Sequence, residues 1–577
     1  MQKLSPKFTL IFALVGLLAL IFSPQIAVLP ASKNLLDWVR FGILPTLMLL
    51  VLLLSCFRRL NIAVWTWLPI ALLAPQELFY LTTYGKPTDA HALAIVFETD
   101  LSEASGYLSG LGALLLTALV LILILFVLAS QGLGKITWPR YARLGVWSVV
   151  LLGMLYVADE ERRYAIAYPI AEKANTEETL LSRRPLPQSH NLFHQTYPIN
   201  LLLAANEYRV QQQALKNIAL QSQDFQFGAS QQVPHQQRQI YVLVIGETLR
   251  PDRMQLNGYS RPTMPRLSGL GAEVISFQDM VSPWAWTRMS VPVIISRKPA
   301  ADTRYFFPEK SLVAAFSEAG FKTYWLSTQS PLGVHDSSIA LHANEADEVS
   351  YLNPVGYKKE GFYDEVILPA FERIVQRQEP KQLIVVHTLG SHFSYADRYP
   401  DNFDLFQPSG KGQQLGMHDR NNKTKLNNAY DNTIAYTDYL LFHLIEAMRS
   451  QQAVSSLLLV ADHGENIFDC DCDKSGHGHN TEYDYRVGAL WWGSEQFHQW
   501  YAPKVAQLKR AAKLPLMTTQ TFHTLLDLAQ IGYPQADVSQ SYAAVGFRPT
   551  PRILASGHDF DLVAKDKICK LLPPARH

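Results

Sequence analysis

Carboxylate and imidazole side chains lie at the ends of short apolar runs from Gln239 onward in this 577-residue sequence. Glu247 directly follows QIYVLVIG, and Asp462 and His463 directly follow SSLLLVA. Such runs are typical of buried strands, and the active sites of open α/β sheets form beyond the carboxyl ends of their strands. Carboxylate oxygen and imidazole nitrogen together suit Zn²⁺, and suit Mn²⁺ less well. The pattern therefore predicts a metal site at these strand ends.

Further histidines accompany this group. The run QLIVVHTLG carries His387 and leads to His392, and the later sequence GHGH contains His477 and His479. A single polar residue at a strand end is an ordinary turn feature, but its recurrence at three strand ends favours a functional site. His387 is expected to support its strand end as a buried histidine with its hydrogen bonds satisfied.

A hydroxyl nucleophile beside the metal would complete a site for group transfer. The stretch SPWAWTRMSVPVIIS offers Ser282, Thr287, Ser290 and Ser296. The residues after Thr287 are typical of a helix start, where backbone N–H groups and the helix dipole favour anionic oxygens. On spacing alone, an N-cap role is the simpler explanation of Thr287. The sequence leaves both interpretations open.

Helical intervals separate the apolar runs from Gln239 onward. LVAAFSEAG and YDEVILPAFERIVQR lie between runs that are continuously apolar rather than alternating. Continuous apolar runs are expected for strands that are buried on both faces of a mostly parallel sheet, and alternation with helices predicts a layered α/β fold. We expect residues 238–577 to form one such domain, with helices flanking the sheet.

The first 157 residues have a different composition. They contain 16 charged residues, whereas the other 420 contain 85. Five stretches approach the roughly 20 apolar residues that a membrane-spanning helix needs. These are residues 8–29, 41–57, 62–81, 107–128 and 144–157, of which the last is the weakest. We therefore expect an N-terminal bundle of five transmembrane helices. Glu77 lies near the outer end of the third, where its side chain is expected to snorkel to the interface.

Basic residues in the short loops predict the orientation. Seven Lys and Arg residues lie in the first, third and fifth flanking segments, against two or three in the others. Because Lys and Arg are retained on the cytoplasmic side, the N-terminus is expected inside and everything after residue 157 outside. A cleavable signal peptide over residues 8–29 is the alternative, but the apolar run is long and no A-x-A site follows it.

The remaining composition sets further limits. Residues 158–237 are polar and Gln-rich with apolar residues at helical spacing, which predicts bridging helices and a linker. A net charge of +1 gives no electrostatic basis for nucleic-acid binding. In the exported part, Cys569 could form a disulfide with Cys470 or Cys472, or the latter two could be a soft-metal site.

Several longer motifs occur in a fixed order. They are VLVIGETLRPDRMQLNGYSRPTMPRL, WAWTRMSVPVII, HTLGSHFSYADRYP and LLLVADHGE, with FETDLSEASGYLS, KTYWLSTQ and NNAYDNTIAYTDYLL in addition. This set resembles the membrane-anchored phosphoethanolamine transferases of the alkaline-phosphatase and sulfatase superfamily. The resemblance extends over nearly the whole chain, and it is greatest to the branch that modifies the lipopolysaccharide core.

The resemblance implies a role for individual residues. The zinc ligands of the family are matched by Glu247, Thr287, Asp462 and His463. Thr287 also matches the nucleophile, which carries phosphoethanolamine as a covalent intermediate. His392 and His477 match histidines that bind the substrate phosphate or a second zinc ion, and His479 is an alternative to His477.

The resemblance also implies substrates and a location. Phosphatidylethanolamine is the expected donor, and lipopolysaccharide core, lipid A or another envelope glycan is the expected acceptor. The chain is expected to be a monomer in the bacterial inner membrane, with its catalytic domain in the periplasm.

Three positions depart from the family pattern. Thr328 stands where Asn is common, and Val487 and Gly488 stand where Val-Pro precedes an aromatic residue. Ile95 stands where the family usually has Asn, eight residues before Glu103. The first two departures are expected to affect packing, and the third concerns the substrate site. Glu103 matches the family's loop glutamate, which faces the active site, although a solvated loop charge explains it equally well.

Other functions fit parts of this pattern. A phosphodiesterase or sulfatase could have the same fold, but sulfatases modify the first residue of C/S-x-P-x-R, and Ser290 is followed by Val-Pro-Val-Ile without the arginine. A phosphoglycerol transferase would use a different lipid donor. A membrane-anchored ligand-binding sensor is the alternative from another class, and the complete set of candidate zinc ligands favours an enzyme over it.

Overall fold

The computed structural model divides into two compact units. It describes residues 6–28, 38–98, 112–167, 193, 195–233, 236–302, 307–329, 338–353, 362–413, 415–469, 473–564 and 572. The first unit takes in Met1–Glu98 and Leu111–Val210, and the described part of the second begins at Gln211. The domain boundaries expected after residues 157 and 237 stay predictions.

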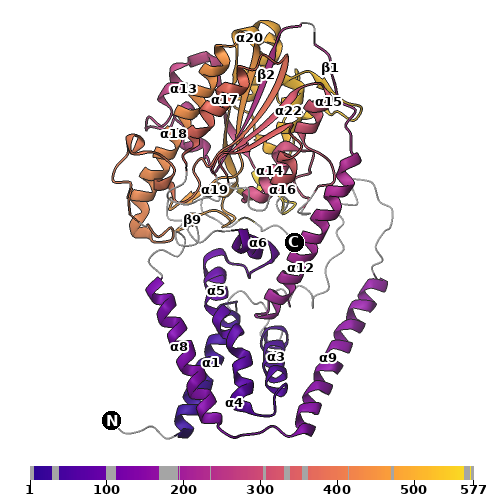
Figure 1. Ribbon diagram of the computed structural model, residues 1–577, viewed down its shortest axis with the longest axis vertical. Helices are drawn as coiled ribbons and strands as arrows, with labels where there is room; N and C mark the ends of the chain where they lie inside the picture. Colours follow the sequence, from indigo (N-terminus) through magenta and orange to yellow (C-terminus); the bar gives the residue numbers. More distant parts are fainter. Residues whose placement is uncertain are drawn as a thin grey trace. The chain divides into compact units, whose positions relative to one another are not determined.

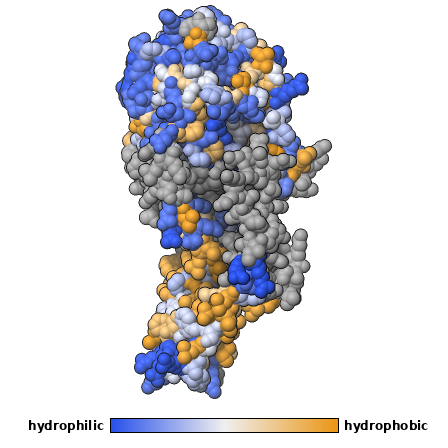
Figure 2. Space-filling model, turned by 90° about the vertical axis from the view of Figure 1, so that its right-hand side faces the viewer, coloured by the Kyte–Doolittle hydropathy of each residue, from blue (hydrophilic) through white to orange (hydrophobic). Residues whose placement is uncertain are grey.

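The first unit consists of helices. The longer ones are α1 (Pro6–Val28), α3 (Leu44–Ser55), α5 (Leu68–Tyr84), α6 (Ala90–Glu98), α8 (Gly112–Leu133), α9 (Arg140–Ala167) and the start of α12 (Ile199–Gln221) (Figure 1). Shorter turns are η2 (Trp38–Ile43), α4 (Leu60–Ala63) and η3 (Val64–Trp67). Hydrophobic residues cover much of the visible surface of this unit, whereas hydrophilic residues predominate on the second (Figure 2). An apolar outer surface is what a lipid environment favours.

Three helical stretches among the described residues are long and apolar enough to cross a membrane. They are Lys7–Ala27, Leu60–Tyr84 and Leu114–Leu133, and they correspond to the first, third and fourth expected spans. In the second expected span, α3 has 12 residues and is about 18 Å long, which is shorter than a hydrocarbon core of about 30 Å. The fifth lies in α9, which continues into the charged run DEERR. The structure thus supports three of the five spans.

The packing of α1 shows how this unit is held together. Ala13, Leu17 and Ile21 recur at intervals of four residues, so they lie on one face of the helix, and all three are fully buried. They belong to one apolar cluster with Phe126 of α8 and Ala71 of α5. The helix is apolar all round, and the small residue Ala13 lets its neighbours approach closely.

An eight-stranded sheet forms the centre of the second unit, in the order β11–β3–β10–β7–β2–β6–β4–β5. The strands are β2 (Gln239–Gly246), β3 (Val274–Val281), β4 (Lys322–Ser327), β5 (Glu348–Tyr351), β6 (Lys381–His387), β7 (Val454–Ala461), β10 (Arg486–Gly493) and β11 (Leu516–Met517). Only β10 runs antiparallel to its neighbours, and the other pairs in this sheet are parallel. The expected mostly parallel sheet is confirmed, with one antiparallel strand that the sequence did not predict.

Helices cover both faces of this sheet. The structure shows α13 (Pro265–Gly269), α14 (Thr287–Ile295), α15 (Leu312–Glu318), α16 (Ser338–Ala343), α17 (Ile367–Val375), α18 (Lys423–Arg449), α19 (Glu482–Tyr485), α20 (Glu495–Trp500), α21 (Ala502–Ala511), α22 (Thr521–Leu528) and α23 (Phe560–Ala564). Helices α17 and α18 lie on one face, and α15 and α22 lie on the other (Figure 1). Two small ladders pair β1 (Ser230–Gln231) with β12 (Ile531–Gly532) and β8 (Asn466–Ile467) with β9 (Ser475–Gly476). The layered α/β architecture expected from the alternating pattern is therefore present.

The register of the central strands positions their ends. Every residue of β2 and β7 is buried, as expected for strands with helices on both faces. Ile245 of β2 pairs in parallel with Val460 of β7 and with His387 of β6. The carboxyl ends of β6, β2 and β7 therefore lie side by side, and the residues that follow them emerge at one edge of the sheet.

Candidate active site

Glu247, Asp462 and His463 meet at this edge of the sheet. All three side chains are buried, and one ligand atom from each lies within 4.8 Å of the others. His463 Nε2 is 3.5 Å from Glu247 Oε1 and 3.4 Å from Asp462 Oδ2. The three residues converge because they directly follow two neighbouring parallel strands.

The hydroxyl of Thr287 reaches the same group. Thr287 Oγ1 is 3.3 Å from Glu247 Oε2 and 3.1 Å from His463 Nε2. Thr287 is the first residue of α14, and the N-cap position belongs to Trp286, which has an extended backbone. The N-cap interpretation of Thr287 is therefore wrong, and its hydroxyl faces Glu247 and His463.

The other hydroxyls of this segment form different hydrogen bonds. The Ser282 hydroxyl donates to Ser290 Oγ, and the Ser290 hydroxyl donates to the carbonyl oxygen of Trp284. The Ser296 hydroxyl donates to the carbonyl oxygen of Pro292. Of the four candidate nucleophiles, Thr287 is the one that the structure brings to the carboxylate and imidazole ligands.

The lone pairs of this cluster fit a cation. Asp462 Oδ1 accepts the backbone N–H groups of Thr248 and His463, but Oδ2 has no hydrogen-bond partner among the described residues. His463 Nδ1 is 2.9 Å from the carbonyl oxygen of Gly464, and because only an N–H can donate there, Nε2 keeps its lone pair. Two carboxylate oxygens, one imidazole nitrogen and a hydroxyl are a donor set that suits tetrahedral Zn²⁺.

The electrostatic environment of Glu247 also favours a cation at this site. Its burial, together with the nearby Asp462 carboxylate, raises the pKa of Glu247 well above its usual range. Two ionised carboxylates are unfavourable at such a short separation without a positive charge between them. A divalent cation would stabilise the ionised form of both side chains.

His477 lies against this group, and Glu465 lies behind it. The ring centroids of His477 and His463 are 4.3 Å apart, and His477 Nδ1 is 3.4 Å from Glu465 Oε2. Burial lowers the pKa of His477 to about 4, so its imidazole is neutral near pH 7. Burial also raises the pKa of the Glu465 carboxyl to about 8. Sequence reasoning did not assign Glu465, although its position two residues after His463 was a signal.

The other histidines have different surroundings. His479 Nε2 is 2.9 Å from the carbonyl oxygen of Ser475 in its own loop, so the structure favours His477 over His479 beside the cluster. His392 Nδ1 is 2.6 Å from the carbonyl oxygen of Phe393. Burial lowers the pKa of His392 well below its usual range. His387 is buried as expected, but its Nε2 has no hydrogen-bond partner in the described part of the chain, so the expectation that it is satisfied was wrong for this nitrogen.

Gln329 is a second residue that sequence reasoning missed. Its amide nitrogen Nε2 donates to Glu247 Oε2 at 2.9 Å and to the carbonyl oxygen of Thr388 at 3.0 Å. Gln329 comes two residues after the end of β4, at the same edge of the sheet as Glu247, Asp462 and His463. Its position after a buried strand was the signal for it, and its amide fixes the orientation of the Glu247 carboxylate.

Thr328, where Asn is common in the family, forms a hydrogen bond to a buried carboxylate. The Thr328 hydroxyl donates to the buried carboxylate of Asp364. The same carboxylate accepts the backbone N–H groups of Leu389 and Gly390, which precede His392. Thr328 thus helps to fix the loop that leads to His392.

Close packing explains the second departure. A Cβ atom at Gly488 would lie 2.8 Å from both Leu249 Cγ and Met254 Sδ. The N–H of Gly488 donates to the carbonyl oxygen of Leu249 at 2.7 Å. A larger residue at this position would therefore need the side chains of Leu249 and Met254 to shift where β10 approaches the segment after β2.

Some expected residues lie outside the described part of the chain. Glu103, Cys470, Cys472 and Cys569 are among them, so the loop glutamate and the disulfide stay predictions. Ile95 lies in α6. Cys56, in the first unit, is a free cysteine.

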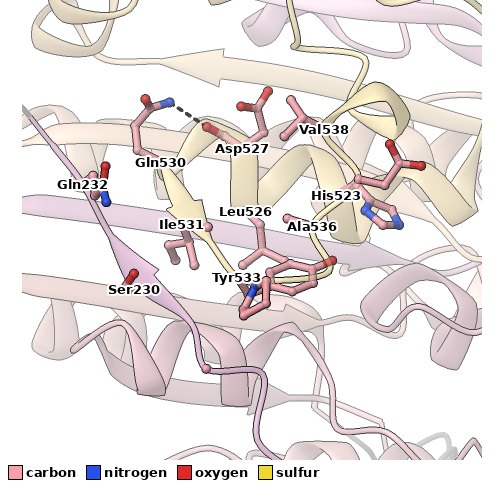
Figure 3. Close-up of a pocket in the computed structure, with 14 residues that line it drawn as sticks. Ser230, Gln232, His523, Leu526, Asp527, Gln530, Ile531, Tyr533, Ala536 and Val538 are labelled. Carbon is pink, nitrogen blue, oxygen red and sulfur yellow. Dashed lines mark hydrogen bonds between the residues drawn. The ribbon is translucent and has the colours of Figure 1, made fainter.

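A surface pocket of about 530 Å³ lies elsewhere in the second unit. Figure 3 shows it between the strand that carries Ser230 and the segment that follows α22, with Asp527, His523 and Tyr533 among the lining side chains. None of the expected site residues lines it. The pocket is therefore separate from the candidate metal site.

Acidification should destabilise the fold around His523 in this pocket. Burial lowers the pKa of His523 to about 4 from a usual value of 6.5. Between these two values the unfolded chain binds more protons than the folded chain, so stability falls as the pH falls from 6.5 towards 4. In His523→Gln this loss should be smaller by up to about 3 kcal/mol. Urea unfolding of the parent and of His523→Gln across this pH range measures the free energy of unfolding of each. Hydrogen exchange of the α22 amides reports the change close to residue 523. Identical pH profiles for the two proteins would contradict the prediction.

The chain is similar to a known protein family and to characterised proteins. Residues 239–531, more than half of the chain, match the Sulfatase family. The chain is 26% identical over 491 residues to the phosphoethanolamine transferase EptC of Escherichia coli (strain K12), and the alignment covers 82% of this chain and 81% of that protein.

Solved structures show the same architecture. The C-terminal periplasmic domain of EptC from Escherichia coli, in complex with Zn, is 25% identical with a TM-score of 0.50, and the match covers 56% of this chain and 91% of that domain. The integral membrane protein EptA from Neisseria meningitidis, a lipooligosaccharide phosphoethanolamine transferase, is 18% identical with a TM-score of 0.62. That match covers 94% of this chain and 98% of the other, and at this identity it shows a shared fold.

Proposed function

The chain belongs to the Sulfatase family, and from this we propose that it transfers phosphoethanolamine from phosphatidylethanolamine to a glycolipid of the bacterial envelope. The observation that carries the proposal is the position of the Thr287 hydroxyl, 3.3 Å from Glu247 Oε2 and 3.1 Å from His463 Nε2. A relative over 82% of the chain is a phosphoethanolamine transferase, which favours this activity over hydrolysis.

One Zn²⁺ ion is the proposed cofactor. Its ligands would be Glu247, Asp462, His463 and the Thr287 hydroxyl. The unpartnered Asp462 Oδ2, the lone pair that His463 Nε2 directs toward the Thr287 hydroxyl, and the zinc complex of a related domain support this choice. When bound, zinc would lower the pKa of the threonine hydroxyl and neutralise charge on the phosphoryl oxygens.

The proposed reaction has two displacement steps at phosphorus. In the first, a bond forms between Thr287 Oγ1 and phosphorus, and the bond from phosphorus to the diacylglycerol oxygen breaks. The proton that leaves Oγ1 is passed to the departing oxygen, so diacylglycerol leaves as a neutral alcohol. In the second step an acceptor oxygen bonds to phosphorus and the bond to Thr287 Oγ1 breaks, which restores the hydroxyl.

Protein groups around Thr287 would assist both steps. Thr287 begins α14, so backbone N–H groups of the first helical turn favour the anionic phosphoryl oxygens. His392 and His477, which are neutral near pH 7, would hold the phosphate, or would accept the proton of the Thr287 hydroxyl and pass it to the departing oxygen, a contribution of about 10²–10⁴-fold.

The proposed location is the inner membrane. Five crossings with a cytoplasmic N-terminus would place the catalytic domain in the periplasm, and the three apolar helical stretches support a membrane anchor. The acceptor would be lipopolysaccharide core or lipid A, and the enzyme would act as a monomer.

A donor comparison tests the proposal. The purified full chain, loaded with zinc, should release diacylglycerol from phosphatidylethanolamine and should retain labelled phosphoethanolamine on Thr287. Release from phosphatidylglycerol instead would identify a phosphoglycerol transferase. Turnover of neither lipid by the zinc-loaded chain would favour the sensor alternative.

The acceptor needs a cellular experiment. Mass spectrometry of lipopolysaccharide from cells with and without the chain should show one added phosphoethanolamine. Its presence on core fragments would support core modification, and its presence on lipid A fragments would assign the acceptor there.

A further inference from the structure

Glu77 is buried inside the first unit. Its side chain is 1% exposed, so the expectation that it snorkels to the interface was wrong. Glu77 Oε1 accepts the backbone N–H of Thr88 at 3.2 Å and the Asn200 side-chain amide at 2.8 Å. The carboxylate therefore joins α5, the turn before α6 and the start of α12.

Four oxygen atoms of this group have no hydrogen-bond partner among the described residues. They are Glu77 Oε2, Tyr80 Oη, Thr88 Oγ1 and Asn200 Oδ1. Thr88 and Asn200 are each 1% exposed. Tyr80 lies one helical turn after Glu77 on the same face of α5, and it is half-buried as a residue. Buried polar atoms are rarely left without a partner, so this cluster is expected to bind one.

The chemistry of the four atoms limits what that partner is. Glu77 Oε2 and Asn200 Oδ1 only accept hydrogen bonds, the hydroxyls of Tyr80 and Thr88 can accept as well as donate, and Glu77 supplies a negative charge. A phosphate group would be repelled by this carboxylate. The nearby cation Lys86 already pairs with Asp89 at 3.1 Å. Magnesium and calcium sites ordinarily use more charged or water ligands than one carboxylate offers. A primary ammonium group carries one positive charge and three N–H donors, and it fits this set.

We propose that Glu77, Tyr80, Thr88 and Asn200 bind a primary ammonium group, the one in the headgroup of phosphatidylethanolamine. The inference rests on the proposed function, since it names the site that recognises the donor lipid. Glu77 lies seven residues before the end of α5, about 10 Å along the helix axis. The stretch Leu60–Tyr84 is longer than a hydrocarbon core, so this depth is close to the lipid headgroups. A lipid headgroup therefore has shorter access to the cluster than a free amine in water.

A series of lipids that differ only in N-methylation tests the site. The probes are phosphatidylethanolamine, its N-methyl and N,N-dimethyl derivatives, and phosphatidylcholine, which keep the positive charge while N–H donors are removed one by one. Binding is measured by native mass spectrometry on the full chain carrying Thr287→Ala, so that the lipid is not consumed. Affinity should fall along the series, by about tenfold or more between the two ends. Equal affinity for all four lipids would overturn the proposal without any substitution in the cluster.

Two substitutions in the cluster sharpen the test. In Glu77→Gln, the side-chain oxygen still accepts from Thr88 and Asn200, but an NH₂ group replaces Oε2, donates to the unpartnered oxygens and excludes an ammonium. This variant should lose the preference for phosphatidylethanolamine. Thr88→Val removes one oxygen without a change of charge and should lose part of the preference. Gln76→Ala, at the exposed neighbour of Glu77, should keep it.

The controls separate this proposal from the proposed function. Zinc content of Glu77→Gln should equal that of the parent, because the metal ligands lie in the second unit. Free ethanolamine should displace the lipid only weakly, and displacement at equal concentration would assign the site to the soluble amine. A Glu77→Gln chain that keeps the full lipid preference would overturn the site while the transfer reaction stands. Conversely, lipid preference in a chain that never transfers phosphoethanolamine would keep the site and reject the function.

Discussion

Thr287→Ala should abolish diacylglycerol release from phosphatidylethanolamine, with a loss of roughly 10³-fold or more in rate. The reason is that the Thr287 hydroxyl is the one oxygen nucleophile of its segment that lies at 3.1 Å from His463 Nε2. Diacylglycerol released from labelled lipid gives the rate. Zinc content, measured on the same samples, shows whether the remaining ligands still bind the metal.

Two controls belong with this variant. Thr287→Ser keeps a hydroxyl and should retain part of the activity. Ser290→Ala removes a buried hydroxyl from the next turn of α14, where it bonds to the carbonyl oxygen of Trp284, and should leave transfer nearly unchanged. If Thr287→Ala releases diacylglycerol at a rate close to that of the parent, the nucleophile is another group.

Asp462→Asn should remove zinc binding, with a loss of affinity of about 100-fold or more, and transfer should be lost with it. The substitution keeps an acceptor for the N–H groups of Thr248 and His463, but it can place an NH₂ group where Oδ2 now has no partner. An amide nitrogen there cannot ligate the ion. In the metal-free protein the same substitution relieves repulsion with Glu247, so stability without zinc should not fall.

Asp438→Asn is the matched control for this prediction. Asp438 is also fully buried, and its carboxylate accepts the backbone N–H groups of Arg266 and Leu267 away from the metal ligands. This variant should lose stability but keep zinc. Metal analysis and thermal unfolding with and without zinc distinguish the two variants, since ligand binding raises the melting temperature only where the site is intact. Stoichiometric zinc in Asp462→Asn would reject Asp462 as a ligand.

Local pattern was sufficient to predict the strand-end group. The runs before Glu247 and Asp462 are continuously apolar, which indicates parallel strands, and parallel neighbours carry their ends to one edge. The position of these strand-end residues could be predicted without information on which strands pair. The same pattern explains why Gln329 was missed, because its role depends on where β4 lies in the sheet order and on its hydrogen bond across 82 residues to Glu247.

Long-range pairing also limited the other predictions. The sequence of β10, RVGALWWG, does not distinguish an antiparallel strand from a parallel one, because all of its residues but the first are buried. Glu77 was interpreted as an interfacial charge because its partner Asn200 lies 123 residues later in the chain. The α9 segment has the length of a span, but its apolar part is short and a charged run continues it, so composition alone did not define its role.

The candidate metal ligands follow two different strands, and the backbone N–H of Thr248 donates to Asp462 Oδ1 across 214 positions of sequence. Because the chain is synthesised from its N-terminus, Glu247 is made long before Asp462 and His463. A fragment that ends before Asp462 would lack two of the three candidate ligands, so on the proposed zinc site metal uptake would follow synthesis and pairing of β2 with β7. If the proposed site binds zinc, the zinc content of a preparation would then report the fraction of molecules that have finished folding.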